Sequence, residues 1–264
     1  DVILQKADPY GNRTQPAPLW NSVVADVTDF QWKDEKWMAD RKKYDERRQP
    51  VSIYETSLGQ WKTGEELITF VKEQGYTHVE LHPVMEFLEE GSDGYPTSAY
   101  FAVSTRYGTP AYFAAIVDGL HQEGIGVILD WSPAQFPRYA GGLEKFDGTP
   151  LYEVKDPNMA VHPMWGTMLY NYDSPMVTDF LISNACFWLE VFHVDGLRMD
   201  DVDAMLYLDY GRKDGWTPNI YGSNENLHAI EFLKHLNSIV KKRDPGALLI
   251  AQEDGLWPEL TDSV

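Results

Sequence analysis

The hexapeptide Gly126-Val127-Ile128-Leu129-Asp130-Trp131 decides the fold class of this chain. Its unbroken apolar run predicts a strand of a parallel sheet buried on both faces, with a carboxylate at its end. Short strand-like runs also occur at 51–55, 78–81, 194–198 and 247–251. Between them, helical spacing of apolar residues is found at 65–75, 110–123, 176–192 and 227–241. The alternation predicts a series of βαβ units around a parallel sheet.

Acidic residues fall at or just beyond the ends of three predicted strands, at Asp130, Asp200 and Glu253. In a (β/α)8 TIM barrel, this rim carries the active site. A doubly wound sheet would show the same alternation, but no G-x-G-x-x-G pattern follows the first strand. We therefore expect an α/β chain with about the first five strands of a TIM barrel.

The chain is expected to have two regions, because its residue pattern changes near residue 50. Residues 1–50 are rich in turn-formers and charges, which predicts a linker or the trailing edge of a preceding domain. Within them, the run 33–48 has mixed charge and is interpreted as a solvated surface. Residues 51–264 are expected to form the partial barrel. The chain begins without Met, and we expect it to be part of something longer.

Composition limits the classes of function. The chain has 264 residues, 43% of them hydrophobic, and a net charge of −19, so it is expected to be globular and not to bind nucleic acid. No apolar run approaches the roughly 20 residues of a membrane span, so no membrane partner is expected. The single cysteine, Cys186, fits a reducing compartment. His and Cys show no metal-ligand spacing, so no metal is predicted.

The stretch from Asp195 to Asp200 carries the chemistry. Arg198 and Asp200 lie two apart on a predicted strand, so their side chains point the same way. A guanidinium beside a carboxylate keeps the carboxylate ionised, as a nucleophile requires. A retaining glycosidase needs such a carboxylate together with a protonated acid nearby. An ordinary buried Asp–Arg pair fits the same spacing, and the residues alone do not separate the two interpretations.

Several long motifs, in order, resemble glycogen (1,4-α-glucan) branching enzymes of the α-amylase superfamily. The hexapeptide at 126–131 with Pro133-Ala134 is similar to a conserved superfamily region. Three further stretches are similar to the branching group in particular: Phe146-Asp147-Gly148-Thr149-Pro150-Leu151-Tyr152, His162-Pro163 with Trp165-Gly166-Thr167, and Met205-Leu206-Tyr207-Leu208-Asp209-Tyr210. The likeness covers essentially the whole chain. It implies that residues 1–50 form the trailing edge of an N-terminal β-sandwich.

The resemblance also implies an activity and its residues. Asp200 matches the nucleophile, Arg198 its charge partner, Asp130 the carboxylate that ends the third strand, and Tyr95 a tyrosine platform for the donor sugar. The implied reaction needs no cofactor: Asp200 cleaves an α-1,4-glucan as a glucosyl-enzyme, and a 6-hydroxyl of another glucan unit takes the chain to form an α-1,6 branch. The family implies a cytoplasmic location.

Two glutamines depart from the family pattern at substrate-binding and catalytic positions. Gln135 stands where a His normally binds the sugar, and a Gln keeps a donor but no charge. Gln252 stands where the family has its acid/base Glu, and an amide cannot protonate a leaving oxygen. Glu253 could replace that acid only if the strand end is bulged, because neighbours on a strand face opposite ways. The ungapped match is preferred, since Trp257-Pro258 aligns without a shift.

Two additional acids, Asp201 and Asp203, follow Asp200. They would oppose its ionisation through like-charge repulsion, unless they point into solvent. With these departures, two functions compete: a branching glycosyltransferase or part of one, and a noncatalytic relative that binds glucan as a scaffold module. A plain α-glucan hydrolase fits the branching-type motifs less well. Five strands where a barrel needs eight predict a fragment, or completion by another chain.

Overall fold

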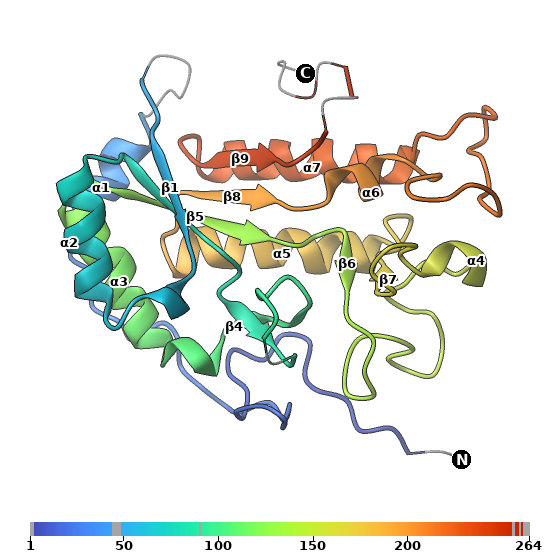
Figure 1. Cartoon of the computed structure of the whole chain (residues 1–264), viewed down its shortest axis with the longest axis horizontal. Coiled ribbons are helices and arrows are strands. Elements are labelled where there is room, and N and C mark those ends of the chain that lie inside the picture. The colour runs from blue at the N-terminus through green and yellow to red at the C-terminus, as the bar shows by residue number, and fades with distance from the viewer. Residues whose placement is uncertain (1–2, 44–48, 90, 255–256, 259, 261–264) are drawn as a thin grey trace.

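The computed structural model describes residues 3–43, 49–89, 91–254, 257–258 and 260. A five-stranded sheet of order β1-β2-β5-β8-β9 lies at its centre (Figure 1), and every neighbouring pair is parallel. Its strands are β1 (Ile53–Thr56), β2 (His78–Leu81), β5 (Gly126–Trp131), β8 (Gly196–Met199) and β9 (Leu248–Ala251). Each strand lies beside its predecessor along the chain, as in a (β/α) barrel and unlike a doubly wound sheet, whose order reverses. The predicted partial barrel is confirmed.

Four long helices connect these strands: α2 (Gly64–Gln74), α3 (Pro110–Gln122), α5 (Pro175–Val191) and α7 (Leu227–Arg243). In Figure 1, α5 and α7 run behind β5, β8 and β9. Side-chain oxygens cap the first turns of α2, α3 and α7: Thr63 accepts from Glu66 N–H, Thr109 from Tyr112 N–H and Asn226 from Ala229 N–H. Gly75 ends α2 in the left-handed conformation, with φ of 75°. These signals are local, which is why the sequence predicted the four helices to within a few residues.

The loops contain elements that the sequence did not predict. A β-hairpin of β3 (Met85–Phe87) and β4 (Thr97–Val103) occupies the region after β2, and a small pair of β6 (Gln135–Phe136) and β7 (Met168–Leu169) lies within the long loop after β5. Short helices are α1 (Glu35–Arg41), α4 (Pro157–Ala160) and α6 (Val202–Leu206), with 3₁₀ turns at Leu58–Gln60 and Thr105–Tyr107. Their shortness gives little periodicity to detect.

The interpretation of the run 33–48 as a solvated surface is wrong for Asp34 and Arg41. These two residues are buried, with only 3% and 6% of their surface exposed. Arg41 Nη1 lies 3.0 Å from Asp195 Oδ1 and donates to two backbone carbonyls, and Arg41 Nη2 pairs with Asp244. His121 bridges Asp34 and Asp195 through its two ring nitrogens, at 2.8 and 2.9 Å. These charges are buried because they satisfy one another. Residues 44–48 of the run lie outside the described residues.

Large aromatic side chains fill the space between the sheet and its helices. Trp131 and Trp188 are fully buried, and each indole N–H finds an acceptor: Asn184 Oδ1 at 2.8 Å for Trp131 and the Tyr100 carbonyl at 3.0 Å for Trp188. A buried indole N–H without a partner would be costly, so these bonds fix how the rings pack. Among the described helices, none combines the length and the apolar character needed to cross a lipid bilayer.

Candidate active site

Four predicted site residues meet at the carboxyl ends of the central strands. Asp130 and Arg198 are register partners on β5 and β8, and Asp200 follows β8 directly. Arg198 Nη1 lies 3.4 Å from Asp130 Oδ2 and 3.4 Å from Asp200 Oδ1. Tyr95, from the loop between β3 and β4, donates its hydroxyl hydrogen to Asp130 Oδ2. The structure therefore brings together residues from three separate segments of the sequence, around 95, 130 and 198–200, at the rim where barrel enzymes carry their sites.

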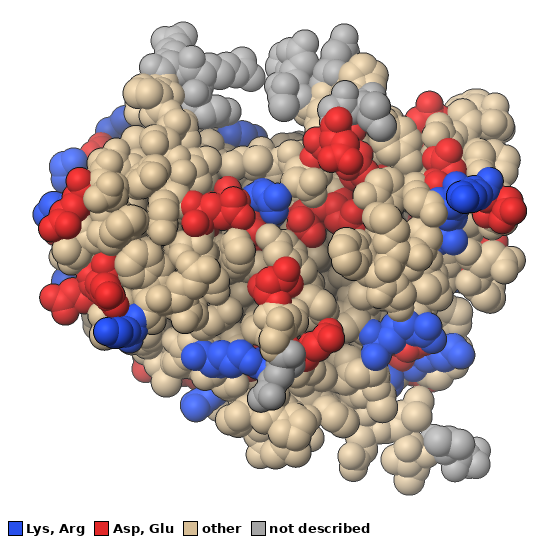
Figure 2. All heavy atoms as spheres, viewed as in Figure 1, with Lys and Arg blue, Asp and Glu red and all other residues tan. Residues whose placement is uncertain are grey.

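Negative charge is in excess around these residues. Burial and the Asp201 and Asp130 carboxylates raise the pKa of Asp200 to about 6, against the opposing effect of Arg198. Burial and the Asp130 carboxylate also raise the pKa of Glu80, on β2, to about 7. Sequence reasoning missed Glu80, because an acidic residue inside a short strand carries no local signal of a site. Figure 2 shows acidic groups at the centre of one face, with basic groups mostly toward its margins.

The two additional acids are both buried, so the alternative that they point into solvent is wrong: Asp201 is 8% exposed and Asp203 is 3% exposed. Asp201 has a φ of 59°, in the left-handed region that Asp tolerates better than most residues. The predicted repulsion is found for Asp201, which raises the pKa of Asp200. Burial and nearby acids raise the pKa of Asp203 itself to about 6.

The register of β8 and β9 places Gln252. Arg198 pairs with Ile250 and Met199 with Ala251, without a bulge. Register partners lie on the same face of a sheet, so Gln252, two residues after Ile250, continues the face of Arg198, and Glu253 follows the opposite one. Gln252 Oε1 accepts a hydrogen bond from Asp201 N–H at 3.1 Å, whereas Glu253 Oε1 accepts from Trp257 N–H at 2.9 Å. The geometry favours the ungapped match.

Gln135, on β6, has both ends of its amide engaged within the protein. Its Nε2 donates to Asp201 Oδ2 at 3.0 Å, and its Oε1 accepts from the Thr167 hydroxyl. His162 Nε2 also lies 3.0 Å from Asp201 Oδ2. Asp201 therefore serves as the common partner of Gln135 and His162, a structural role that the sequence did not predict.

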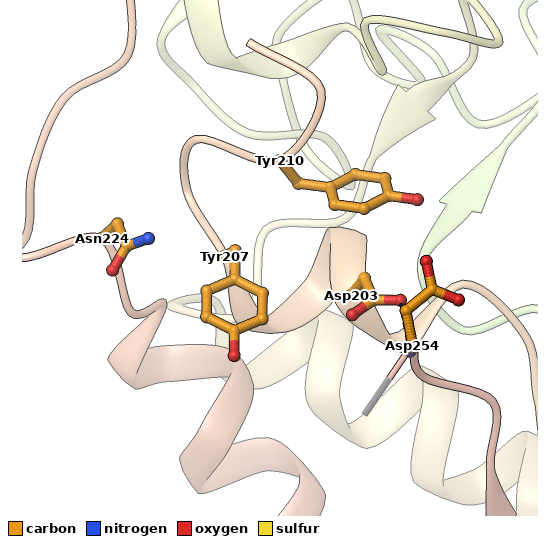
Figure 3. Close-up of a pocket in the computed structure, with 5 residues that line it drawn as sticks. All are labelled: Asp203, Tyr207, Tyr210, Asn224 and Asp254. Carbon is orange, nitrogen blue, oxygen red and sulfur yellow. Dashed lines mark hydrogen bonds between the residues drawn. The ribbon is translucent and has the colours of Figure 1, made fainter. Parts of the chain in front are cut away.

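A pocket of about 370 Å³ opens beside α6 (Figure 3) and is lined by Asp203, Tyr207, Tyr210, Asn224 and Asp254. In the figure, the carboxylates of Asp203 and Asp254 approach each other below the ring of Tyr210. Asp203 Oδ2 accepts from Asp254 N–H at 3.2 Å, and Asp203 Oδ1 is buried with no hydrogen-bond partner in the described part of the chain. The pocket combines aromatic rings with hydrogen-bonding groups, as sites for polar small molecules do.

Asp130 also belongs to a group of three potential metal ligands. Glu55 on β1, His82 after β2 and Asp130 each offer one ligand atom, and these three atoms lie within 4.8 Å of one another. The sequence predicted no metal because it searched for His and Cys at local spacing. Ligands contributed by three separate strands have no such spacing, so only the fold reveals the group.

The structure resembles a solved α-amylase-type protein. A crystal structure described as a putative alpha amylase from Salmonella typhimurium matches 93% of this chain and 38% of that chain, with a TM-score of 0.71 and 22% sequence identity. At this identity the likeness shows the fold alone: the sheet and helices are those of an α-amylase-type barrel, of which this chain forms a part.

Comparison of the sequence with curated proteins finds relatives of a single kind among the most similar. The chain is 46% identical to the 1,4-alpha-glucan branching enzyme GlgB of Nitrosococcus oceani over 275 residues, which cover 99% of the chain and 37% of the relative. It is 48% identical to the enzyme of that name from Thermobifida fusca, over 98% of the chain and 36% of the relative. No protein-family model matches the chain. Nearly the whole chain is thus homologous to glycogen branching enzymes, as its motifs predicted, and it spans somewhat more than a third of their length.

Proposed function

We propose that this chain forms the donor side of the active site of a 1,4-α-glucan branching enzyme. In this proposal, Asp200 is the nucleophile that attacks the anomeric carbon of an α-1,4-linked chain, and Arg198 stabilises its ionised form. Tyr95 packs against the donor sugar while its hydroxyl holds Asp130. The transferred chain then passes to a 6-hydroxyl of a second glucan, which gives an α-1,6 branch in glycogen, in the cytoplasm.

The observation that carries the proposal is the arrangement of Arg198, Asp130 and Asp200 at the carboxyl ends of β5 and β8. One guanidinium nitrogen lies 3.4 Å from an oxygen of each carboxylate. An ordinary structural ion pair needs one acid, and it needs no position at the strand ends. Here a second carboxylate shares the cation at the barrel rim, where retaining glycosidases place their nucleophile.

We also propose that the pocket beside α6 binds part of the glucan chain through its hydroxyl groups. Its volume of about 370 Å³ falls in the ~300–1,000 Å³ range of small-molecule sites. Tyr210 and Tyr207 offer ring surface, and Asp203 offers a buried oxygen that has no hydrogen-bond partner among the described residues. A neutral, hydroxyl-rich ligand suits such a lining, because its hydroxyls can donate to carboxylates without bringing charge.

Gln252 favours a second candidate function, a glucan-binding module without turnover. Its side chain occupies the face where an acid would be needed, and an amide has no proton to give to a leaving oxygen. In this alternative Glu253 does not compensate, because its carboxylate is engaged with the Trp257 N–H. In this alternative, the chain binds α-glucan through the same surface and produces no new linkages.

The two functions are separated by incubating the purified chain with amylose and counting new α-1,6 linkages by proton NMR, with the Asp200→Asn variant as control. Branch formation that disappears in the control supports the transferase. Retained binding of maltoheptaose, measured by calorimetry, without new linkages supports the module. A folded chain that neither binds maltoheptaose nor forms branches contradicts both.

A further inference from the structure

Three side chains of different strands converge beside the proposed glucan site. Glu55 lies on β1, His82 directly after β2 and Asp130 on β5, which are consecutive strands of the sheet. His82 Nε2 lies 3.0 Å from Glu55 Oε1, and one ligand atom from each of the three residues lies within 4.8 Å of the others. Because all three are held at the ends of hydrogen-bonded strands, their spacing is set by the sheet.

One oxygen of Asp130 is available to a ligand. The residue is 0% exposed, and its Oδ2 serves both Tyr95 and Arg198. Its Oδ1 is buried and has no hydrogen-bond partner among the residues that the structure describes. A buried carboxylate oxygen without a partner is costly, and a cation would remove that cost.

The charge around Asp130 is also unbalanced. The carboxylates of Glu80, Asp130 and Asp200 are all close to one cation, Arg198. Glu55 adds a further acid, which pairs with His82 at 3.0 Å.

We propose that Glu55, His82 and Asp130 bind a divalent transition-metal ion, with Zn²⁺ as the best match. One imidazole nitrogen and two carboxylate oxygens are a donor set that Zn²⁺ accepts, at metal–ligand distances of about 2.0–2.2 Å. Such distances place tetrahedral ligand atoms roughly 3.3–3.6 Å apart. His82 Nε2 and Glu55 Oε1 lie 3.0 Å apart, and all three ligand atoms lie within 4.8 Å of one another, so side-chain rotations of this size complete the site.

Three protein ligands leave a fourth position of a tetrahedral ion open. Water or a sugar hydroxyl can fill it, because the ring of His82 lies 6.2 Å from that of Tyr95, the proposed sugar platform. The metal site itself does not depend on the proposed transferase activity.

A metal-free arrangement makes the opposite prediction. A proton held between Glu80 and Asp130 would use the free oxygen, and His82 would then form a simple ion pair with Glu55. That arrangement needs no ion and gives the chain no affinity for Zn²⁺.

The test is isothermal titration of the chelator-treated chain with Zn²⁺, with Co²⁺ absorption as a second measurement of coordination. We expect one ion per chain. His82→Leu and Glu55→Gln should each weaken Zn²⁺ binding at least about tenfold. Loss of a residue that only hydrogen-bonds a metal ligand already lowers metal affinity by about 10–100-fold, and loss of a ligand itself should cost no less. Both residues are partly or largely exposed, so these variants should fold.

His228→Leu is the matched control, because His228 forms an exposed pair with Asp173 at 3.6 Å. It should bind Zn²⁺ as the parent chain does. Absence of stoichiometric binding, or binding that His82→Leu leaves intact, overturns the proposal. Asp200→Asn separates the two proposals: it should abolish glucan transfer and keep the Zn²⁺ site.

Discussion

Gln252 Oε1 accepts a hydrogen bond from the backbone N–H of Asp201, the residue after Asp200, at 3.1 Å. This bond holds the Gln252 amide next to the residue that follows the proposed nucleophile. By the register of β8 and β9, Gln252 and Arg198 lie on the same face of the sheet. The position suits a catalytic acid, but the group there has no acidic proton. Cleavage of unactivated glucan should therefore be slow, while steps that need no acid are spared.

Gln252→Glu should raise the rate of α-1,6 branch formation from amylose by at least about 100-fold, the lower end of what general acid catalysis supplies. The new carboxylate can still accept from Asp201 N–H, so the local structure should be kept. With α-maltosyl fluoride, whose leaving group needs no protonation, the same substitution should change the rate of fluoride release little. Proton NMR and a fluoride electrode give the two rates.

The matched control is Glu253→Gln, which removes the neighbouring carboxylate that accepts from Trp257 N–H. It should leave both rates of the Gln252→Glu variant unchanged. A loss of branching in Glu253→Gln on the parent background would mean that Glu253 is the acid and that the assignment of Gln252 is wrong.

Fluoride release from α-maltosyl fluoride should increase with pH through about 6. Burial, Asp201 and Asp130 raise the pKa of Asp200 to about 6, and only its ionised form attacks. Asp201→Asn removes a like charge, so the inflection should move to lower pH. Asp214→Asn, at an exposed loop position, is the control and should leave the profile in place. An inflection that Asp201→Asn does not move, or moves upward, would contradict this account.

The sequence predicted the five strands, the four long helices and the meeting of Asp130, Arg198 and Asp200, because each depends on local patterns or on the common edge of parallel strands. It could not predict which partners Asp201 finds, because Gln135 and His162 reach it from a long loop. It also missed the burial of Arg41. A charged residue in a charged run looks solvated, and only the tertiary fold supplies the partners that make its burial tolerable.

Arg41→Met should destabilise the chain by about 3–5 kcal/mol, because it leaves Asp195 and Asp244 buried without their cation. Arg41→Lys keeps the charge but not the fork of donors, so its loss should be smaller. Lys36→Met is the control: Lys36 pairs with Asp40 on the exposed side of the same helix, and no measurable change in Tm is expected. Thermal unfolding followed by circular dichroism gives the ranking. Equal Tm values for Arg41→Met and Lys36→Met would show that the buried network is not stabilising.

The same network predicts how stability depends on pH. Burial opposes ionisation of Asp195, but His121 and Arg41 outweigh it and lower its pKa to about 2. Its contribution is therefore complete above about pH 4 and is lost as pH falls toward 2. Burial likewise opposes the charged form of His121, but Asp195 and Asp34 raise its pKa. That contribution is present below about pH 6.5 and is lost as pH rises through the raised pKa.

Both contributions of this network overlap between about pH 4 and 6.5, so Tm should be highest there. His121→Gln should have a lower Tm in that range and a smaller decline on the alkaline side. A parent Tm that rises steadily from pH 6 to 9 would contradict the assignment of a charged His121.

Tyr210 tests the pocket beside α6. It is partly exposed, and its ring lies edge-on to that of His162, with centroids 5.9 Å apart, so the ring is held in place at the pocket rather than free in solvent. Tyr210→Ala should weaken maltoheptaose binding about tenfold, equivalent to about 1.4 kcal/mol, as loss of an aromatic anchor does. Tyr221→Ala is the control, because Tyr221 is 79% exposed and does not line the pocket. If both substitutions weaken binding equally in calorimetry, the effect comes from the general surface, and the pocket is not where the glucan binds.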